Sequence, residues 1–430
     1  MAIARRNFLK RTLLGTLGAG WMRSRGSAQT GESPALPRIK DYRPLGRVGF
    51  KVSDIGAGSI TDEGVLRAAL DAGVNYIDTG ESYPGHHRTI AKAVTGLDRK
   101  AFFVCTKLEI FKDHSKEGFL SRARKSLADL EMDYVDCLMM HMPERAEYLK
   151  LEGFHAAMNE LRAEGRVRHV GVSHHGSFWY RDPEESMEKV LLTAAEDGRF
   201  EVFLMAYNFL NMDRSEKVLG ACRERKIGVA LMKATPTAIY YSMKERIDEM
   251  RSRGKEVGGF YIEGLKRYED KINRAQAFIK EHDLKNPEEM KAAAVQFVLG
   301  NPDVNTVCCL PKTYEELSSF LRLSGTRLSK QGGQMIQAYA DGCGELYCRH
   351  ACGVCEPACP YGVPVNTIMR YFHYYAGQGR EREAMMRYGA IPGVRADACA
   401  DCPGHCEKAC PYRVPVQGML LAAHASLCLT

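Results

Sequence analysis

Residues 134–173 have the sequence YVDCLMMHMPERAEYLKLEGFHAAMNELRAEGRVRHVGVS, in which a helix-like stretch separates two short apolar runs. The runs Tyr134–His141 and Val167–Ser173 have the length and apolar character of strands. The same alternation recurs between Tyr42 and Leu323. It predicts six further strands, at Val52–Ala57, Asn75–Thr79, Phe102–Lys107, Val202–Asn208, Ile227–Lys233 and Asn305–Leu310.

Eight such repeats over about 280 residues predict an α/β fold of the (β/α)8 TIM-barrel type, which typically takes about 250 residues. We place the barrel at residues 42–325. A hairpin of Tyr42–Leu45 with Gly49–Lys51 is expected to close its bottom. A doubly wound sheet is the alternative, but it seldom uses eight parallel strands in this rhythm.

Four polar side chains lie at or just after the carboxyl ends of three successive predicted strands: Asp78, Tyr83, Lys107 and His141. In TIM barrels the chemistry lies at these strand ends. Alone, each has a structural explanation: a helix cap, a half-buried aromatic ring, a surface charge and a core histidine. Together they predict an acid–base site, in which Asp78 pairs with Lys107 and Lys107 lowers the pKa of the Tyr83 phenol. Tyr83 would then exchange a proton with a carbonyl oxygen that His141 orients.

At these four positions the chain resembles the aldo-keto reductase superfamily, whose catalytic tetrad they match one by one. The resemblance extends from the N-terminal hairpin through the last predicted strand, in PDVNTVCCLPKTYEEL (residues 302–317). It implies an oxidoreductase that acts on a small carbonyl compound or alcohol, with NADP(H) held by residues after strands five to eight. The cofactor-binding positions implied in this chain are Ser173, His174, Met232, Lys233, Lys312 and Thr313.

The implied nucleotide site departs from the family pattern. Ser173 and His174 stand where Ser and Asn usually hold the nicotinamide amide. Met232 replaces the aromatic residue that stacks on the nicotinamide, and Lys233 replaces its neighbouring serine. Ser318 stands where an arginine usually clasps the 2′-phosphate. These departures weigh against a freely exchanging NADPH site.

Eight cysteines near the C-terminus fall into two matching runs, YCRHACGVCEPACPYGVPV (347–365) and ACADCPGHCEKACPYRVPV (398–416), which form a 51-residue repeat. Each run ends in Cys-Pro, as in bacterial-type ferredoxins that hold two [4Fe–4S] clusters. In those proteins the last cysteine of each run binds the other run's cluster. The predicted ligands are therefore Cys348, Cys352, Cys355 and Cys410 for one cluster, and Cys399, Cys402, Cys406 and Cys359 for the other.

Two alternatives compete with the clusters. Structural zinc prefers paired CxxC knuckles without the Cys-Pro ends, and disulfides suit small secreted scaffolds better than a long chain. We place a connecting helix at residues 326–342 and a small α+β two-cluster domain at residues 343–430. The tetrad and the cysteine runs together resemble the superfamily branch that carries a C-terminal dicluster ferredoxin. Within this domain we expect helices at Asn366–Gln378 and Arg382–Tyr388, with Tyr371, Phe372, Tyr374 and Tyr375 packing the clusters against the barrel.

The N-terminus, ARRNFLKRTLLGTLGAGWMRSRGSAQ, matches a twin-arginine export signal at Arg5 and Arg6. A short apolar stretch follows, and a small-residue cleavage site ends at Ala28. We expect a signal peptide at residues 1–28, a linker at residues 29–41, and export of the folded protein to the periplasm or another extracytoplasmic space. A plain basic amphipathic start is the alternative.

The charge of the chain agrees with this division. The formal net charge is +7, and residues 1–28 contain six basic residues and no acidic one, which leaves the remainder close to neutral. No nucleic-acid partner is therefore expected. No later segment is long and apolar enough to predict a transmembrane helix.

Two further features have a structural and a functional explanation. The stretch from Thr235 to about Asn286 has mixed charge, typical of a solvated helix pair, and would otherwise be a lid or a partner-docking arm. The pairs His86–His87 and His174–His175 could bind a metal ion together with His141. Adjacent histidines more often diverge, with one facing solvent.

The sequence thus predicts an exported iron–sulfur oxidoreductase that exchanges electrons with a redox protein partner. One alternative is a non-catalytic electron-transfer subunit that uses the barrel as a scaffold. The other is a cytoplasmic NADP(H)-dependent reductase.

Overall fold

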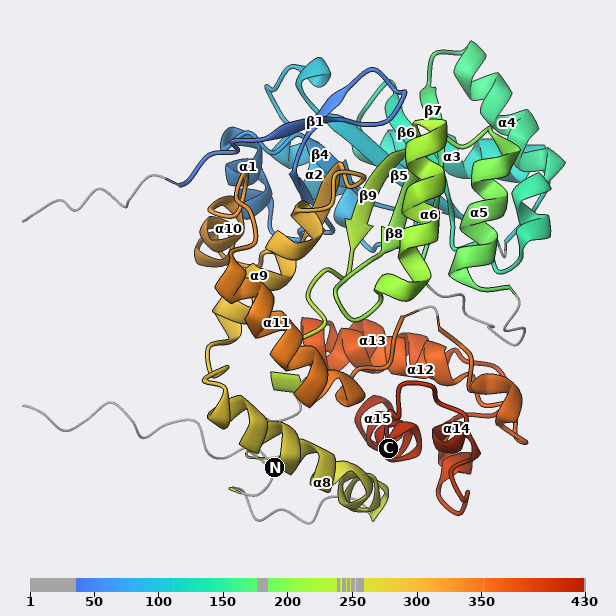
Figure 1. The fold of residues 1–430 in the computed structure, drawn as a ribbon. Helices are drawn as coiled ribbons and strands as arrows, with labels where there is room; N and C mark the ends of the chain where they lie inside the picture. Colours follow the sequence, from blue (N-terminus) through green and yellow to red (C-terminus); the bar gives the residue numbers. More distant parts are fainter. Residues whose placement is uncertain are drawn as a thin grey trace, which may run out of the picture. The chain divides into compact units, whose positions relative to one another are not determined.

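Eight parallel strands close into a barrel in the computed structural model, which describes residues 36–428 apart from Phe111, residues 176–184, most of residues 238–258 and Ala351 (Figure 1). β10 pairs with β3 to close the ring, and the other strands pair in sequence order. The TIM-barrel prediction is confirmed. The strands are β3 (Ile55–Ala57), β4 (Tyr76–Asp78), β5 (Phe103–Glu109), β6 (Val135–His141), β7 (Val167–His174), β8 (Val202–Ala206), β9 (Gly228–Met232) and β10 (Thr306–Cys309).

Helices cover the outside of the barrel (Figure 1). β5 and β6 are buried along their whole length, because helices cover one face of the sheet and packed side chains fill the other. Polar N-caps fix where several helices begin: Asp62 accepts a hydrogen bond from the Val65 amide, and Ser115 accepts one from the Gly118 amide. The helices are α1 (Glu63–Asp71), α2 (His86–Ala93), α3 (Lys116–Leu130), α4 (Glu152–Ala163), α5 (Met187–Asp197), α6 (Met212–Arg225), α9 (Pro287–Leu299) and α10 (Tyr314–Leu321).

The predicted hairpin is confirmed, with its second strand shifted along the chain. β1 (Tyr42–Pro44) pairs antiparallel with β2 (Lys51–Ser53). The predicted strand Val52–Ala57 is therefore wrong as one unit, since it divides at Asp54 between the hairpin and β3. A long-range contact lies at this break: the buried Asp54 carboxylate accepts hydrogen bonds from the Ser324 hydroxyl at 2.7 Å and the Gly325 amide at 2.8 Å.

The C-terminal segment is helical rather than α+β. The described residues of 343–428 contain no strand, and the predicted helices are present. The expectation of an α+β domain was wrong because each Cys-Pro loop leads directly into an apolar helix instead of an alternating strand. The elements are α11 (Lys330–Cys343), which supplies the predicted connecting helix, α12 (Val365–Phe372), a π-helical turn (His373–Gly377), α13 (Glu381–Gly389), α14 (His405–Lys408) and α15 (Val416–Leu427).

A second hydrophobic core joins the C-terminal helices to the segment inserted after β9. The described end of this insertion is α8 (Gly259–Glu281), which packs against α15 and α11. Tyr268, Ile272 and Ala275 of α8 are buried in this core. α8 therefore differs from the expected solvated helix in burying one face, although charged side chains such as Asp270 and Arg274 remain exposed on the other. Residues 36–428 belong to one compact unit.

The predicted signal peptide, residues 1–28, and residues 29–35 of the linker lie outside the described residues. Among the helices that the structure does describe, none combines the length and the apolar content needed to cross a bilayer.

Candidate active site

The four predicted acid–base residues converge at the carboxyl end of the barrel. The Nζ of Lys107 donates hydrogen bonds to Asp78 Oδ2 at 2.7 Å and to the Thr79 carbonyl at 2.6 Å. The same Nζ lies 4.9 Å from the centroid of the Tyr83 ring. The rings of Tyr83 and His141 meet edge to face, with centroids 5.9 Å apart. The phenol and the imidazole thus face each other, and the buried lysine lies beside the phenol ring.

Burial and charge act against each other at this site. Burial alone lowers the pKa of Lys107, but the Asp78 carboxylate more than offsets this, so the pKa of Lys107 is raised and the ammonium stays charged. Burial raises the pKa of the Tyr83 phenol, and Lys107 opposes that rise without reversing it. The sequence-based expectation of a lowered Tyr83 pKa was therefore wrong in its net sign, although Lys107 acts in the expected direction.

Glu109 is a site residue that the sequence analysis missed. The Nδ1 of His141 lies 2.7 Å from Glu109 Oε1, and both side chains are almost fully buried. Burial tends to raise the pKa of Glu109. Interactions with His141 and Ser82 outweigh burial and lower this pKa to about 2. Glu109 stands two positions after Lys107 in β5, and the period of two in strands places both on one face. Such a carboxylate fixes the ring and leaves the other imidazole nitrogen for a ligand.

The C-terminal segment covers this end of the barrel. A guanidinium nitrogen of Arg370, in α12, lies 3.8 Å from the Met142 sulfur just after β6. The Lys233 Nζ, just after β9, lies 4.7 Å from the centroid of the Tyr374 ring. Arg380 also acts electrostatically on Tyr83. Tyr374 thus packs on the barrel, as predicted.

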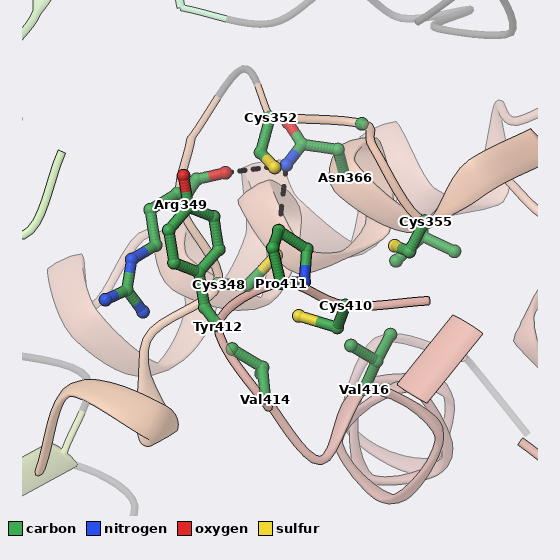
Figure 2. A pocket seen from close by; sticks show the side chains of 12 residues that line it. Cys348, Arg349, Cys352, Cys355, Asn366, Cys410, Pro411, Tyr412, Val414 and Val416 are labelled. Atoms are coloured by element: carbon green, nitrogen blue, oxygen red, sulfur yellow. Dashed lines mark hydrogen bonds between the residues drawn. The ribbon is translucent and has the colours of Figure 1, made fainter. Parts of the chain in front are cut away.

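Four cysteines line a pocket in the C-terminal segment, and they are the first predicted ligand set: Cys348, Cys352, Cys355 and Cys410 (Figure 2). Cys410 comes from the second run, so this pocket brings together cysteines of both runs, as crossed ligation would require. The Asn366 side-chain amide donates hydrogen bonds to the Arg349 carbonyl at 2.8 Å and to the Cys348 sulfur at 3.8 Å.

The cysteines of the second predicted ligand set act on one another electrostatically. After burial, the neighbouring thiols Cys359 and Cys402 help to raise the pKa of Cys399 and of Cys406 to about 12. Neighbouring thiolates destabilise one another, and bound iron relieves this by ligating them.

The arrangement of the cysteines bears on whether they suit a single metal ion, a disulfide or an iron–sulfur cluster. In the described residues, no three His, Cys, Asp or Glu side chains form a set that could hold a single metal ion. One zinc ion would need its sulfurs gathered at about 2.3 Å from the metal. None of the fifteen cysteines is in a disulfide. The four cysteines that line one pocket are thiol donors of the kind that an iron–sulfur cluster would require.

The 51-residue sequence repeat is also a structural repeat. Glu356 accepts a hydrogen bond from the Asn366 backbone amide at 2.7 Å, and Glu407 accepts one from the Gln417 amide at 2.8 Å. The Asn366 and Gln417 side chains then hold backbone carbonyls of the two cysteine loops, at Arg349 and Cys399. The same device therefore fixes each loop to the helix that follows it.

Comparison with known proteins places the barrel in a family. The sequence profile of the Aldo/keto reductase family matches residues 60–341, more than half of the chain. The chain belongs to the aldo/keto reductase family. The carboxyl-end site therefore lies where this fold carries its chemistry.

Individual proteins similar to this chain are also aldo-keto reductases or related reductases. An aldo-keto reductase of Mycolicibacterium paratuberculosis is 35% identical over 130 residues, which are 28% of this chain and 43% of the relative. The methylglyoxal reductase DkgB of Escherichia coli O157:H7 is 30% identical over 123 residues, or 28% and 46%. The chain thus spans less than half the length of these curated relatives. The solved holo form of the Bacillus halodurans aldo-keto reductase AKR11C1 has a TM-score of 0.50 at 22% identity, covering 70% of this chain and 96% of its own, which supports the fold.

The six implied nucleotide positions of this aldo/keto reductase separate into two groups. Ser173 and His174 are buried at the end of β7, and Met232 and Lys233 are half-buried at the end of β9. The exposed Lys312 and Thr313 instead lie at the start of α10, where Thr313 accepts a hydrogen bond from the Glu316 amide at 3.2 Å as an N-cap. Thr313 therefore has a structural task of its own.

The histidine pair after β4 is structural. His86 Nε2 lies 2.9 Å from the Ile60 carbonyl, and its Nδ1 lies 2.9 Å from the Thr79 hydroxyl. Since a carbonyl only accepts, Nε2–H donates and Nδ1 accepts. His87 is also buried, with Nε2 3.1 Å from the Thr106 hydroxyl. Neither ring faces solvent, and the described residues do not combine these pairs with His141 into a metal site.

Replacing His86 with Gln is expected to destabilise the protein less at pH 5.5 than at pH 7.5. Burial lowers the pKa of His86 from 6.5 to about 4. The stabilisation by the neutral ring is complete above pH 6.5 and is lost as the pH falls toward 4, since the unfolded chain binds the proton first. The difference in the free energy of unfolding between wild type and variant should be smaller at pH 5.5 than at pH 7.5 by about 1 kcal/mol. Denaturant titration at the two pH values measures it.

Proposed function

We propose that this aldo/keto reductase family member is an exported iron–sulfur oxidoreductase that interconverts a small carbonyl compound and its alcohol. The observation that carries the proposal is one compact unit that combines the Asp78–Lys107–Tyr83–His141 arrangement with a pocket lined by the crossed cysteine set.

In this proposal Tyr83 moves the proton at the substrate oxygen. Reduction of a carbonyl to an alcohol takes two electrons, which the clusters would supply, and two protons. Tyr83 delivers the proton that reaches the oxygen, and water would supply the proton that reaches the carbon. Lys107, held by Asp78 and the Thr79 carbonyl, stabilises the phenolate that remains. His141, with Nδ1 anchored on Glu109, hydrogen-bonds the carbonyl oxygen through Nε2.

The two cysteine sets would hold the clusters as the sequence predicts. When bound, each [4Fe–4S] cluster stores and passes single electrons, so two clusters match the two-electron change of the substrate. The Asn366 amide on the Cys348 sulfur and the Val363 amide on the Cys359 sulfur at 3.4 Å are donors of the kind that tune cluster potentials.

The twin-arginine motif at Arg5 and Arg6 supports export, since a protein that carries assembled clusters has to leave the cytoplasm folded. Outside the cytoplasm a redox protein partner would supply or remove the electrons. Lys233 and Tyr374 lie together at the mouth, where the family's nicotinamide contacts would be, which supports clusters rather than NADP(H) as the electron source.

An NADP(H)-dependent reductase is the second candidate, and one observation favours it. In the described part of the chain, the buried hydroxyl of Ser173 has no hydrogen-bond partner. The family uses this position to hold the nicotinamide amide, so a bound nucleotide would satisfy it.

An anaerobic single-turnover experiment separates the two candidates. The protein is reduced with dithionite, freed of excess reductant, and mixed with small carbonyl compounds, including methylglyoxal, without nucleotide. We expect the cluster absorption to return to the oxidised form, with one alcohol formed per two electrons lost. Clusters that stay reduced, together with turnover only on addition of NADPH, would contradict the proposal.

A further inference from the structure

A group of basic side chains surrounds the mouth of the barrel beyond the tetrad. His175 follows β7 and Lys233 follows β9, both from the barrel. His350, Arg370 and His373 come from the C-terminal segment. We call these five residues the basic cluster.

A ring contact and electrostatic interactions connect the residues of the basic cluster. The rings of His350 and His373 meet edge to face, with centroids 4.8 Å apart. Lys233 acts electrostatically on His175, His350 and His373 alike. His175 is also within the electrostatic range of His141 and Arg370, so the basic cluster adjoins the tetrad.

The buried histidines of the basic cluster present ring nitrogens that lack partners. His175, His350 and His373 are 5%, 3% and 4% exposed. In the described residues, His175 Nδ1, His350 Nε2 and His373 Nδ1 make no hydrogen bond. Buried polar atoms are nearly always paired in folded proteins, so three orphaned nitrogens on neighbouring histidines indicate a missing ligand.

The charged groups around the basic cluster indicate that the missing ligand is negatively charged. No carboxylate of the described residues lies within ion-pair distance of Lys233. Glu383 is the acid that acts on Lys233, but its oxygens accept hydrogen bonds from Arg380 and Arg387, both at 2.8 Å. Burial lowers the pKa of Lys233, and the guanidinium groups of Arg370 and Arg380 lower it further. An anion would offset both effects.

We propose that the basic cluster is an oxyanion-binding subsite and that the substrate is a small carbonyl compound or alcohol carrying a carboxylate. This inference rests on the proposed function, because it places the reacting carbon at Tyr83 and His141. The carboxylate binds Lys233 and Arg370 and accepts hydrogen bonds from N–H groups of the neighbouring histidines. A 2-oxo acid and its 2-hydroxy acid are the smallest pair of this class.

Calorimetric binding to the anaerobically purified, cluster-containing full chain tests the subsite. The probes are pyruvate and 2,3-butanedione, a neutral dione of the same shape. We expect pyruvate to bind at least about tenfold more tightly, which is the value of a charge-assisted hydrogen bond. Lys233→Gln should remove this preference by weakening pyruvate alone, whereas Lys233→Arg should retain it. The exposed Lys51, on the hairpin strand β2, changed to Gln is the matched control and should bind both probes as the wild type does.

Equal affinities for the two probes, or an unchanged pyruvate affinity in Lys233→Gln, would overturn the inference. So would an NADPH affinity that falls in Lys233→Gln while pyruvate binding stays the same, because the basic cluster would then serve a nucleotide. Binding requires no turnover, so Tyr83→Phe should still prefer pyruvate. A protein that binds pyruvate selectively but never reduces a carbonyl would therefore contradict the proposed function and leave the subsite intact.

Discussion

Tyr83→Phe is expected to lower carbonyl turnover by about 10²- to 10⁴-fold, the usual contribution of a positioned proton donor. The ring stays, so its contacts with Lys107 and His141 are kept, and only the hydroxyl that exchanges the proton is lost. The iron content and the cluster absorption should not change, because Tyr83 is not among the predicted cluster ligands. Rates with reduced protein and the visible spectrum, measured on the same sample, check both statements.

Tyr314→Phe is the matched control for this prediction. Tyr314 is 54% exposed on α10, so loss of its hydroxyl should leave turnover unchanged. If Tyr83→Phe transfers electrons to the carbonyl compound as fast as the wild type, the barrel does not perform acid–base chemistry. The non-catalytic electron-transfer alternative would then be favoured.

Double cysteine substitutions are expected to show crossed cluster binding through the iron count. Cys348→Ala combined with Cys410→Ala should remove one cluster and leave about half of the iron, because the two residues line the same pocket. Cys348→Ala combined with Cys359→Ala should remove both clusters, although these residues belong to the same run. Iron and acid-labile sulfide, measured per polypeptide, give the two results.

Binding run by run predicts the reverse pair of results and would contradict the crossed arrangement. Cys222→Ala is the control, since Cys222 is buried in α6, apart from both cysteine sets, and its loss should keep all of the iron. A wild-type protein whose metal is zinc would also exclude the clusters.

The parts of the site that follow from local pattern could be predicted from the sequence. Apolar runs bounded by polar residues located the barrel strands, and the polar residue ending each run located Asp78, Lys107 and His141. The likeness of the two Cys-Pro runs to bacterial-type ferredoxins predicted a crossed set, and the pocket does bring Cys410 together with three cysteines of the first run. Glu109 was missed because β5 continues two residues beyond the predicted end of its strand, although the period of two pointed to it.

The parts that depend on contacts between distant segments could not be predicted. Arg370 meets Met142 across 228 positions of the chain, and no local pattern encodes that contact. The meeting of Lys233 with Tyr374 is of the same kind. The net rise in the Tyr83 pKa also depends on burial by this covering segment, which the sequence does not state.

Native mass spectrometry of the anaerobically purified protein tests most directly the central claim, that one chain carries both iron–sulfur clusters and a proton-transferring barrel site. We expect a mass that exceeds the polypeptide mass by two [4Fe–4S] clusters, with no retained nicotinamide nucleotide. A mass equal to the bare polypeptide, to a zinc form or to a nucleotide-bound form without iron would contradict it.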